Sequence, residues 1–367
     1  MREVLMFCIS DKVSGGEIYT IELLSGLVEI GWTAHIVGVA NSGLEEAVRD
    51  RGIDFVPTRL LGPKLGRRTA LRLMFSWATQ IREFRRIIRE YPDATIILQY
   101  KLEQLVWAFI SDSRQCLYLE HGPIPNMVTM PIVRWFYRRG LRKTKATLAA
   151  SSPAADALRR LGADPHLIAA GVDDNRREMA LAQVDSERRR LRDLTGSDLV
   201  GVYAGRITAE KGILDAARIC MQSSRLGLVI YGTGPQLDEL LSIVEGSTKV
   251  KYLGVVADAL PSIAASDFSI LLTRDPGEGR PLFGIESISV GTPLVGLVGS
   301  AATMGLQAEF GLDCVRLISR ASVECFEAVI MDLPKRVTAM VPTWRESSSI
   351  VSGMLESTSR GSNAGRG

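Results

Sequence analysis

The stretch "LVGVYAGRITAEKGILDAARICMQSSRLGLVIYGTGP", Leu199–Pro235, carries the pattern on which the fold prediction rests. Two apolar runs, Leu199–Ala204 and Leu226–Tyr231, flank a segment whose apolar residues have helical spacing. Strands that are buried on both faces read as continuous apolar runs, and a helix commonly connects two such parallel strands. The stretch therefore predicts a strand–helix–strand unit in a parallel sheet covered on both faces.

The same alternation extends along most of the 367 residues. It pauses only near "LIAAGVDDN", Leu167–Asn175. The number of expected strands favours two sheets over a single one. We therefore expect an α/β protein with two Rossmann-like, doubly wound domains, residues 1–168 and 169–345. Residues 346–367 would form a C-terminal segment with a disordered, Gly/Ser/Arg-rich tail. Ligands of such sheets bind at the carboxyl ends of the strands.

Composition and charge exclude several classes of protein. No apolar run reaches the roughly 18 residues that span a bilayer, and the N-terminus reads as a first strand rather than a signal peptide. Five scattered cysteines and three histidines show no metal-ligand spacing, so we expect a reducing, cytoplasmic location and no metal site. The net charge is +3, with 23 basic and 17 acidic residues in residues 1–168. Different partners for the two halves follow from this uneven charge.

Two positions in the first half are candidates for ligand contact. Gly15 and Gly16 immediately precede a predicted helix, whose N-terminal N–H groups attract anions. A flexible turn explains the same glycines equally well. His121 follows a predicted strand in "LYLEHGPIP" and is either a hydrogen-bonding group or base in a cleft, or an ordinary loop histidine.

The second half offers a cationic pair. In "AGRITAEKGI", Gly205 ends a strand, Arg206 follows, and Lys211 stands at a predicted helix start. Arg binds two phosphate oxygens at once and Lys acts as a point charge, so the pair suits a diphosphate. Solvated surface charges are the alternative. Gly232 and Gly234 in "YGTGP" form a similar strand-to-helix turn, for which tight backbone geometry suffices as an explanation.

Two carboxylates, Glu278 and Glu286, lie eight positions apart in "EGRPLFGIESISVGTPLV". The first falls in a loop after a strand and the second in the following helix, so both can face one cleft. A carboxylate accepts two hydroxyl donors, which suits the diols of a sugar or a ribose.

Together and in this order, these motifs resemble the family 4 glycosyltransferases, retaining enzymes with the GT-B fold, over roughly Met1 to Trp344. "SGGEIYTIELLSGLVEIGWTAHIVG" resembles the family's Gly-Gly loop and first helix, and "LEHGP" resembles its His-Gly turn. "AGRITAEKGI" resembles the diphosphate motif, and Glu278 and Glu286 resemble the family's pair of glutamates. The resemblance implies two domains facing across a cleft.

The resemblance also implies roles for residues. Arg206 and Lys211 would hold the donor diphosphate, Glu286 the ribose, and Glu278 the hydroxyls of the donor sugar. Other donor contacts would come from Gly15, Gly16, Gly205, Gly232, Gly234, Val255, Leu282, Phe283 and Gly284. His121 would lie near the sugar and the acceptor. In this family the leaving phosphate assists deprotonation of the acceptor, so no protein nucleophile is implied. The absence of an Asp-x-Asp motif fits an enzyme without a metal, in which cationic side chains and helix dipoles offset the diphosphate charge. No cofactor is implied, since the nucleotide sugar is a co-substrate.

One of the departures from the family pattern concerns the end of the chain. Few residues follow Trp344, so we expect the helix that returns to the first domain to be short.

The acceptor would bind the first domain, where two segments are rich in basic residues. A helix over residues 66–91 places Trp77, Ile81 and Phe84 on one face and several arginines on the other, and "VRWFYRRGLRKTK" follows at residues 133–145. Three interpretations stay open: a core-packed helix with a solvated basic face, contact with the inner face of an anionic membrane, or an anionic soluble acceptor. Nucleic-acid binding is disfavoured because no aromatic-lined platform accompanies the charge.

The motifs thus predict a metal-independent, retaining glycosyltransferase that moves a hexose-type sugar to a glycan, lipid-linked or small-molecule acceptor. One alternative with the same fold is a nucleotide-sugar epimerase or pseudo-glycosyltransferase. A catalytically silent scaffold is an alternative from another class, and a dinucleotide oxidoreductase is poorly supported because the first glycine-rich turn lacks the dinucleotide pattern.

Overall fold

The computed structural model describes residues 2–10, 13–60, 67–112, 115–122, 130–274, 278–337 and 339–360, and the side chains of residues 67–75 and 357–360 lie outside the description. The chain divides into two compact units. The first comprises Met1–Ala170 and Trp344–Gly367, and the second comprises Gly171–Thr343. The expected boundaries were 168/169 and 345/346, so the residues after Trp344 join the first unit rather than forming a separate segment. The expected disordered tail lies outside the described residues.

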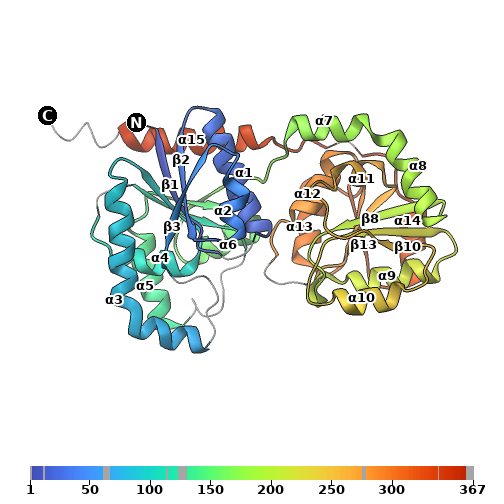
Figure 1. Cartoon of the computed structure of the whole chain (residues 1–367), viewed down its shortest axis with the longest axis horizontal. Coiled ribbons are helices and arrows are strands. Elements are labelled where there is room, and N and C mark those ends of the chain that lie inside the picture. The colour runs from blue at the N-terminus through green and yellow to red at the C-terminus, as the bar shows by residue number, and fades with distance from the viewer. Residues whose placement is uncertain are drawn as a thin grey trace. The chain divides into compact units, whose positions relative to one another are not determined.

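The first unit contains a parallel sheet of seven strands in the order β3-β2-β1-β4-β5-β6-β7 (Figure 1). Its strands are β1 Glu3–Phe7, β2 Thr33–Val39, β3 Ile53–Thr58, β4 Thr95–Leu98, β5 Cys116–Glu120, β6 Ala146–Ala149 and β7 Pro165–Leu167. The helices are α1 Gly15–Glu29, α2 Gly43–Val48, α3 Arg67–Glu90, α4 Lys101–Trp107, α5 Pro131–Leu141, α6 Ser152–Arg160 and α15 Trp344–Arg360.

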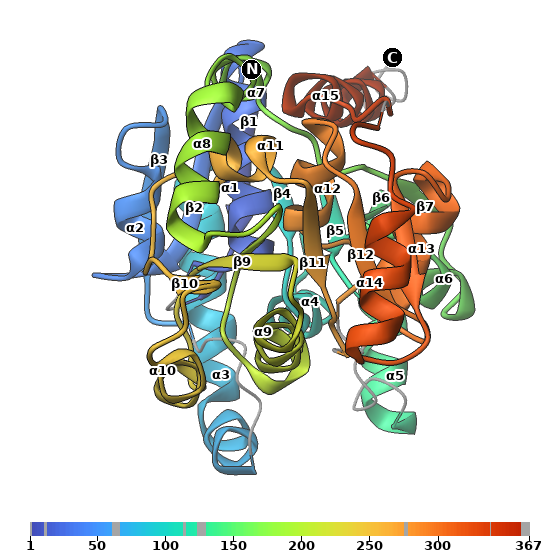
Figure 2. The same cartoon turned by 90° about the vertical axis from the view of Figure 1, so that its right-hand side faces the viewer.

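The second unit contains a parallel sheet of six strands in the order β10-β9-β8-β11-β12-β13. Its strands are β8 Leu199–Ala204, β9 Leu226–Tyr231, β10 Val250–Tyr252, β11 Phe268–Leu271, β12 Leu294–Leu297 and β13 Val315–Ile318. The helices are α7 Asp174–Ala182, α8 Val184–Thr195, α9 Ile213–Gln222, α10 Leu237–Val244, α11 Leu260–Ala265, α12 Leu282–Ser289, α13 Ala301–Phe310 and α14 Val323–Met331, with a 3-10 turn at Ala209–Lys211. Figure 2 shows α8 and α11 on one side of this sheet and α9 and α10 on the other.

Each sheet is central to its own apolar core, as the continuous apolar runs predict. The central strands are almost wholly buried, and the helices cover them with residues such as Phe84 and Trp107 in the first unit and Ile213 and Phe326 in the second. The prediction of two doubly wound α/β domains is therefore confirmed.

Helix α15 corrects one expectation. It is 17 residues long, not short, and it packs along α1 within the first unit (Figure 1). A Cβ on Gly26 of α1 would meet Ser348 Oγ at 2.3 Å, so the absent side chain permits the close approach of the two helices. The Ser348 hydroxyl donates to Leu23 O, and the Trp32 indole N–H donates to Ser352 Oγ. These polar contacts anchor the end of the chain to its beginning.

The long helix of the first half also has the predicted faces where its side chains are described. Phe84 and Ile88 of α3 are buried, and Trp77 and Ile81 are half-buried against the core. Arg82, Arg85, Arg86 and Arg89 are exposed. We also expected Leu73 on the apolar face and Arg68 and Arg72 on the basic face, and their side chains lie outside the description.

Candidate functional site

The candidate residues all follow the carboxyl ends of parallel strands. In the first unit they follow β1 and β5, and in the second they follow β8, β9, β10 and β11, which are neighbours in the sheet. Because neighbouring parallel strands end at the same edge, the loops that follow them share one surface. Each unit therefore has one such surface at the carboxyl ends of its strands, which we call its candidate edge.

The start of α1 forms the candidate edge of the first unit. A Cβ on Gly15 would meet no atom within 4 Å, and one on Gly16 would meet nothing closer than Gln99 Nε2 at 3.5 Å. Internal packing therefore does not require glycine at either position. The N–H of Ser14 donates to Glu17 Oε2 at 2.9 Å, and the hydroxyl of Tyr100 donates to Glu17 Oε1. Glu17 is thus occupied in holding the start of the helix.

His121 lies beside this helix start. Its Cδ2 is 3.9 Å from the position that a Cβ on Gly16 would take, and its ring packs edge-to-face on Tyr19 with centroids 4.9 Å apart. The backbone carbonyl of His121 accepts a hydrogen bond from Ser151. Its Nε2 is buried and has no hydrogen-bond partner among the described residues. Burial lowers the pKa of His121 to about 4, with Lys101 adding to the effect, so the imidazole is neutral near neutral pH.

The candidate edge of the second unit holds a charged pair. Lys211, just before α9, forms an ion pair with Glu278 in the loop that precedes α12. Both side chains are largely buried, and Glu278 Oε2 has no hydrogen-bond partner among the described residues. A buried carboxylate oxygen without a donor is costly, which makes this oxygen a position where a ligand hydroxyl would be favourable.

Arg206 lies beside this pair on the loop after β8. Its side chain is exposed, and no described carboxylate is within ion-pair distance of it. The loop itself is fixed, since the hydroxyl of Tyr203 donates to Arg206 O at 2.7 Å. A guanidinium on a fixed backbone with no internal partner remains available to an anionic ligand.

Packing between two loops accounts for the glycines after β8 and β9. A Cβ on Gly232, whose φ is +129°, would lie 1.9 Å from Gly205 O, and one on Gly234 would lie 2.3 Å from Ile207 O. The loops are also joined by hydrogen bonds from Gly205 N to Tyr231 O and from Ile207 N to Thr233 O. Gly232 and Gly234 are therefore required by the backbone, whether or not a ligand approaches them.

Glu286 has an internal partner that the sequence did not indicate. Arg176, in the first turn of α7, donates from one guanidinium nitrogen to Glu286 Oε1 and from the other to Asp258 Oδ1, both at 2.6 Å. Asp258 also accepts from the N–H of Leu260 at the start of α11. The carboxylates raise the pKa of Arg176 above its ordinary value despite the opposing effect of burial. These partners stand 82 and 110 positions from Arg176 in the chain, so no spacing could have revealed them.

The remaining candidates surround α12 and β10. Phe283 is buried against the ring of Tyr203, and a Cβ on Gly284 would meet Leu306 at 2.6 Å. These side-chain positions are therefore set by packing, and only the backbone near Leu282 and Phe283 is suited to a ligand. Val255, after β10, is 70% exposed and is available for contact.

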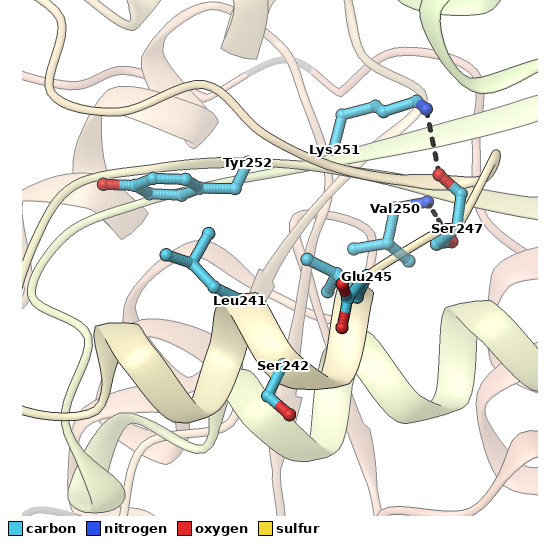
Figure 3. Close-up of a pocket in the computed structure, with 8 residues that line it drawn as sticks. Leu241, Ser242, Glu245, Ser247, Val250, Lys251 and Tyr252 are labelled. Atoms are coloured by element: carbon cyan, nitrogen blue, oxygen red, sulfur yellow. Dashed lines mark hydrogen bonds between the residues drawn. The ribbon is translucent and has the colours of Figure 1, made fainter.

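Two pockets in the second unit differ in their relation to these residues. The pocket in Figure 3, about 530 Å³, is lined by residues of α10 and β10 such as Leu241 and Tyr252, and none of the candidate residues lines it. A pocket of about 420 Å³ is lined by Asp258, Val256 and Tyr231, among others. It adjoins Asp258, the partner of Arg176, and is therefore the hollow nearer to the candidate edge.

Metal-binding clusters and membrane-spanning helices are absent from the described residues. Among the described residues, no group of three or more His, Cys, Asp or Glu side chains is arranged to hold a metal ion. In the same part of the chain, no helix combines the length and apolar character needed to cross a membrane.

Residues 13–176 match the family model described as Glycosyltransferase Family 4. Over 195 residues the chain is 32% identical to alpha-D-kanosaminyltransferase of Streptomyces kanamyceticus, which covers 48% of this chain and 49% of that protein. The chain thus aligns with about half the length of this curated relative.

Solved structures of other proteins share the fold. HepE of Anabaena in complex with UDP and glucose has a TM-score of 0.67 at 17% identity, with coverage of 99% of this chain and 100% of that chain. Sucrose-phosphate synthase of Thermosynechococcus elongatus has a TM-score of 0.69 at 16% identity, with coverage of 97% and 94%. At sequence identities this low, the similarity shows the fold alone. The GT-B fold and the resemblance to the family 4 glycosyltransferases are both confirmed.

Proposed function

We propose that this chain, a relative of the family 4 glycosyltransferases, transfers a sugar from a nucleotide-diphosphate sugar to a hydroxyl of an acceptor. The observation that carries the proposal is the edge after β8 and β11, where Lys211, Glu278 and Arg206 lie together. Two cations and a carboxylate with a buried, unpartnered oxygen match the charges and hydroxyls of such a donor.

In this proposal the two cations hold the diphosphate. An ammonium has three donors, so pairing with Glu278 leaves Lys211 able to bind phosphate oxygens as well. Arg206 supplies a second cation and is free to turn toward the ligand. Glu278 Oε2 accepts a hydroxyl of the donor sugar, and the backbone near Leu282 and Phe283 contributes at the start of α12. No metal is needed to neutralise the diphosphate.

The residues next to this diphosphate site bind the nucleoside of the donor. Glu286 accepts the ribose hydroxyls, and Arg176 acts as a positioning residue because it fixes that carboxylate and Asp258 at the same time. Exposed Val255 contacts the base. HepE was solved with UDP and glucose, so UDP-glucose is the first donor to test here.

The reaction is a retaining transfer of a hexose-type sugar. The bond from the sugar C1 to the β-phosphate oxygen breaks, a bond from C1 to the acceptor oxygen forms on the same face, and the acceptor proton moves to the leaving phosphate. The acceptor, a glycan, a lipid-linked sugar or a small molecule, binds the first unit near Gly16 and the neutral His121. The Nε2 of His121 offers it a hydrogen-bonding position.

A thermal-shift panel of UDP-, GDP-, ADP- and dTDP-sugars, first without metal and then with Mg²⁺, tests the proposal. A ligand at 100 times its Kd adds about 2.7 kcal/mol of stability. We expect one nucleotide to raise the Tm without metal and the rise to disappear in Lys211→Ala. A response to none of them would favour the silent scaffold. If a nucleotide sugar raises the Tm and product analysis then finds that sugar isomerised, the result would favour the epimerase.

A further inference from the structure

The solvent face of α5 combines apolar and basic side chains. Ile132 is 72% exposed and Trp135 is 55% exposed, and Met130, immediately before the helix, is 57% exposed. Ile132, Trp135 and Arg139 stand at helical spacing on one face, whereas Tyr137 and Gly140 face the core. Large apolar side chains are seldom exposed next to each other on a soluble surface without a partner.

The inner side of the helix explains why this face points outward. A Cβ on Gly140 would lie 2.2 Å from the hydroxyl of Tyr118, so glycine allows α5 to pack tightly against β5. Phe136 packs on Phe109 with the two rings tilted, and Phe109 in turn packs against Trp77 of α3. Trp135 extends this aromatic row into solvent, where it contacts Phe136 only at its edge. The fold therefore holds Trp135 outward on a rigid base.

The charge around this face has one sign. No acidic residue occurs between Glu120 and Asp156, while this segment contains Arg134, Arg138, Arg139, Arg142, Lys143 and Lys145. Arg138 and Arg139 donate to the carbonyls of Leu161 and Ala108, and Lys143 donates to those of Ala108 and Ile110. Carbonyls fix these cations without neutralising them. Arg134 and Arg142 are exposed, and their side chains make no hydrogen bond or ion pair with described residues.

A shallow pocket adjoins the same face. It has a volume of about 370 Å³ and is lined by Arg138 and Arg142 together with Leu141 and Leu161. Two guanidinium groups beside apolar walls suit an anionic headgroup whose acyl chains lie next to it.

We propose that the α5 face, defined as Met130, Ile132, Arg134, Trp135, Arg138, Arg139 and Arg142, binds the surface of an anionic lipid bilayer. Ile132 and Trp135 enter the boundary between headgroups and acyl chains, where tryptophan is favoured, and the arginines pair with lipid phosphates. A soluble polyanion would use the charge but would leave the apolar side chains unexplained, which is why the bilayer is the preferred occupant. The proposal stands independently of the donor chemistry.

The test is co-sedimentation of the full chain with vesicles of phosphatidylcholine alone and of phosphatidylcholine mixed equally with phosphatidylglycerol. We expect sedimentation with the anionic vesicles only, and weaker binding as salt is added. The double variant Ile132→Ser/Trp135→Ser should reduce the partition coefficient roughly tenfold or more, and so should Arg134→Glu/Arg142→Glu. Both alter exposed side chains, and unchanged circular dichroism and Tm would establish that they fold.

The matched control is Leu312→Ser/Met340→Ser, which removes two exposed apolar side chains from the second unit. It should bind vesicles like the wild type. No binding of the wild type to anionic vesicles, equal binding to neutral ones, or equal losses in the control and the α5 variants would each overturn the proposal. Binding to heparin without binding to vesicles would overturn it in favour of a soluble polyanion.

Discussion

The two candidate edges use their carboxylates differently. In the first unit, Glu103 accepts from the backbone N–H groups of Ile9, Gln99 and Tyr100, and so joins the ends of β1 and β4. In the second unit, Glu278 has one oxygen on Lys211, and its other oxygen is buried with no hydrogen-bond partner among the described residues. A carboxyl group whose hydrogen bonds are complete stabilises a fold, whereas one with an incomplete set at the carboxyl end of a strand is suited to a ligand. The comparison predicts which substitutions affect activity and which affect stability.

The largest expected effect is the loss of activity in Lys211→Ala. Removing a cation that binds the developing charge on the leaving diphosphate should lower kcat/KM by roughly 10³-fold. The free energy of unfolding should fall as well, because the largely buried Glu278 loses its partner, so kcat/KM is compared per folded molecule. Steady-state kinetics and chemical denaturation on the same sample measure the two quantities, and a variant with wild-type kcat/KM would refute the assignment of Lys211.

The counterpart in the first unit is Glu103→Gln. An amide has only one acceptor oxygen, so its NH₂ group must face a backbone donor that the carboxylate satisfied, and the unfolding free energy should fall by about 3 kcal/mol. Urea denaturation measures it. Activity per folded molecule should stay within a few-fold of the wild type, and a selective loss of activity with intact stability would break the distinction between the two edges.

A smaller effect is expected for Arg176→Met. Losing the residue that positions Glu286 should raise the Kd of the bound nucleotide roughly tenfold, about 1.4 kcal/mol, while kcat changes less than KM. Arg177→Met is the matched control, because Arg177 pairs only with Asp174 in the same helix among the described residues. Isothermal titration calorimetry measures the Kd of each variant. Partial recovery of nucleotide affinity in Arg176→Lys would further separate positioning from a structural role. Equal Kd values for the two methionine variants, with the wild type binding nucleotide, would remove Arg176 from the account.

The last effect appears only at acidic pH and concerns the pH dependence of stability. His121 has a pKa of about 4 in the folded chain and about 6.5 when unfolded, so between these values the unfolded state binds more protons and stability falls as the pH falls. Replacing His121 with Phe should therefore flatten the decrease in Tm across that window. The exposed His166→Phe control should keep the wild-type slope. An unchanged slope in His121→Phe would show that the folded imidazole is protonated.

The sequence was sufficient for features that depend on local pattern. Apolar runs such as Leu226–Tyr231 predicted the strands because a buried parallel strand has no polar face. The positions of Lys211 and Glu278 followed from the rule that loops after neighbouring strands share an edge. Their direct ion pair then emerged in the structure.

Long-range contacts could not be predicted in this way. The bond between Arg176 and Glu286 depends on how α7 and α12 meet, and the packing of α15 on α1 depends on the small residues Gly26 and Ser348 fitting together. Likewise, only packing distinguishes Gly232, whose Cβ would collide with a carbonyl, from Gly15, beside which space is open. Sequence presents these glycines as equivalent.

The most direct test of the account is amide hydrogen exchange with and without the nucleotide sugar that gives the largest thermal shift. We predict protection of the peptides that contain residues 205–212 and 278–286 in the wild type, and none in Lys211→Ala at the same concentration. Protection confined to the α10–β10 pocket of Figure 3, with no change at residues 205–212 and 278–286, would contradict the assignment of the donor site.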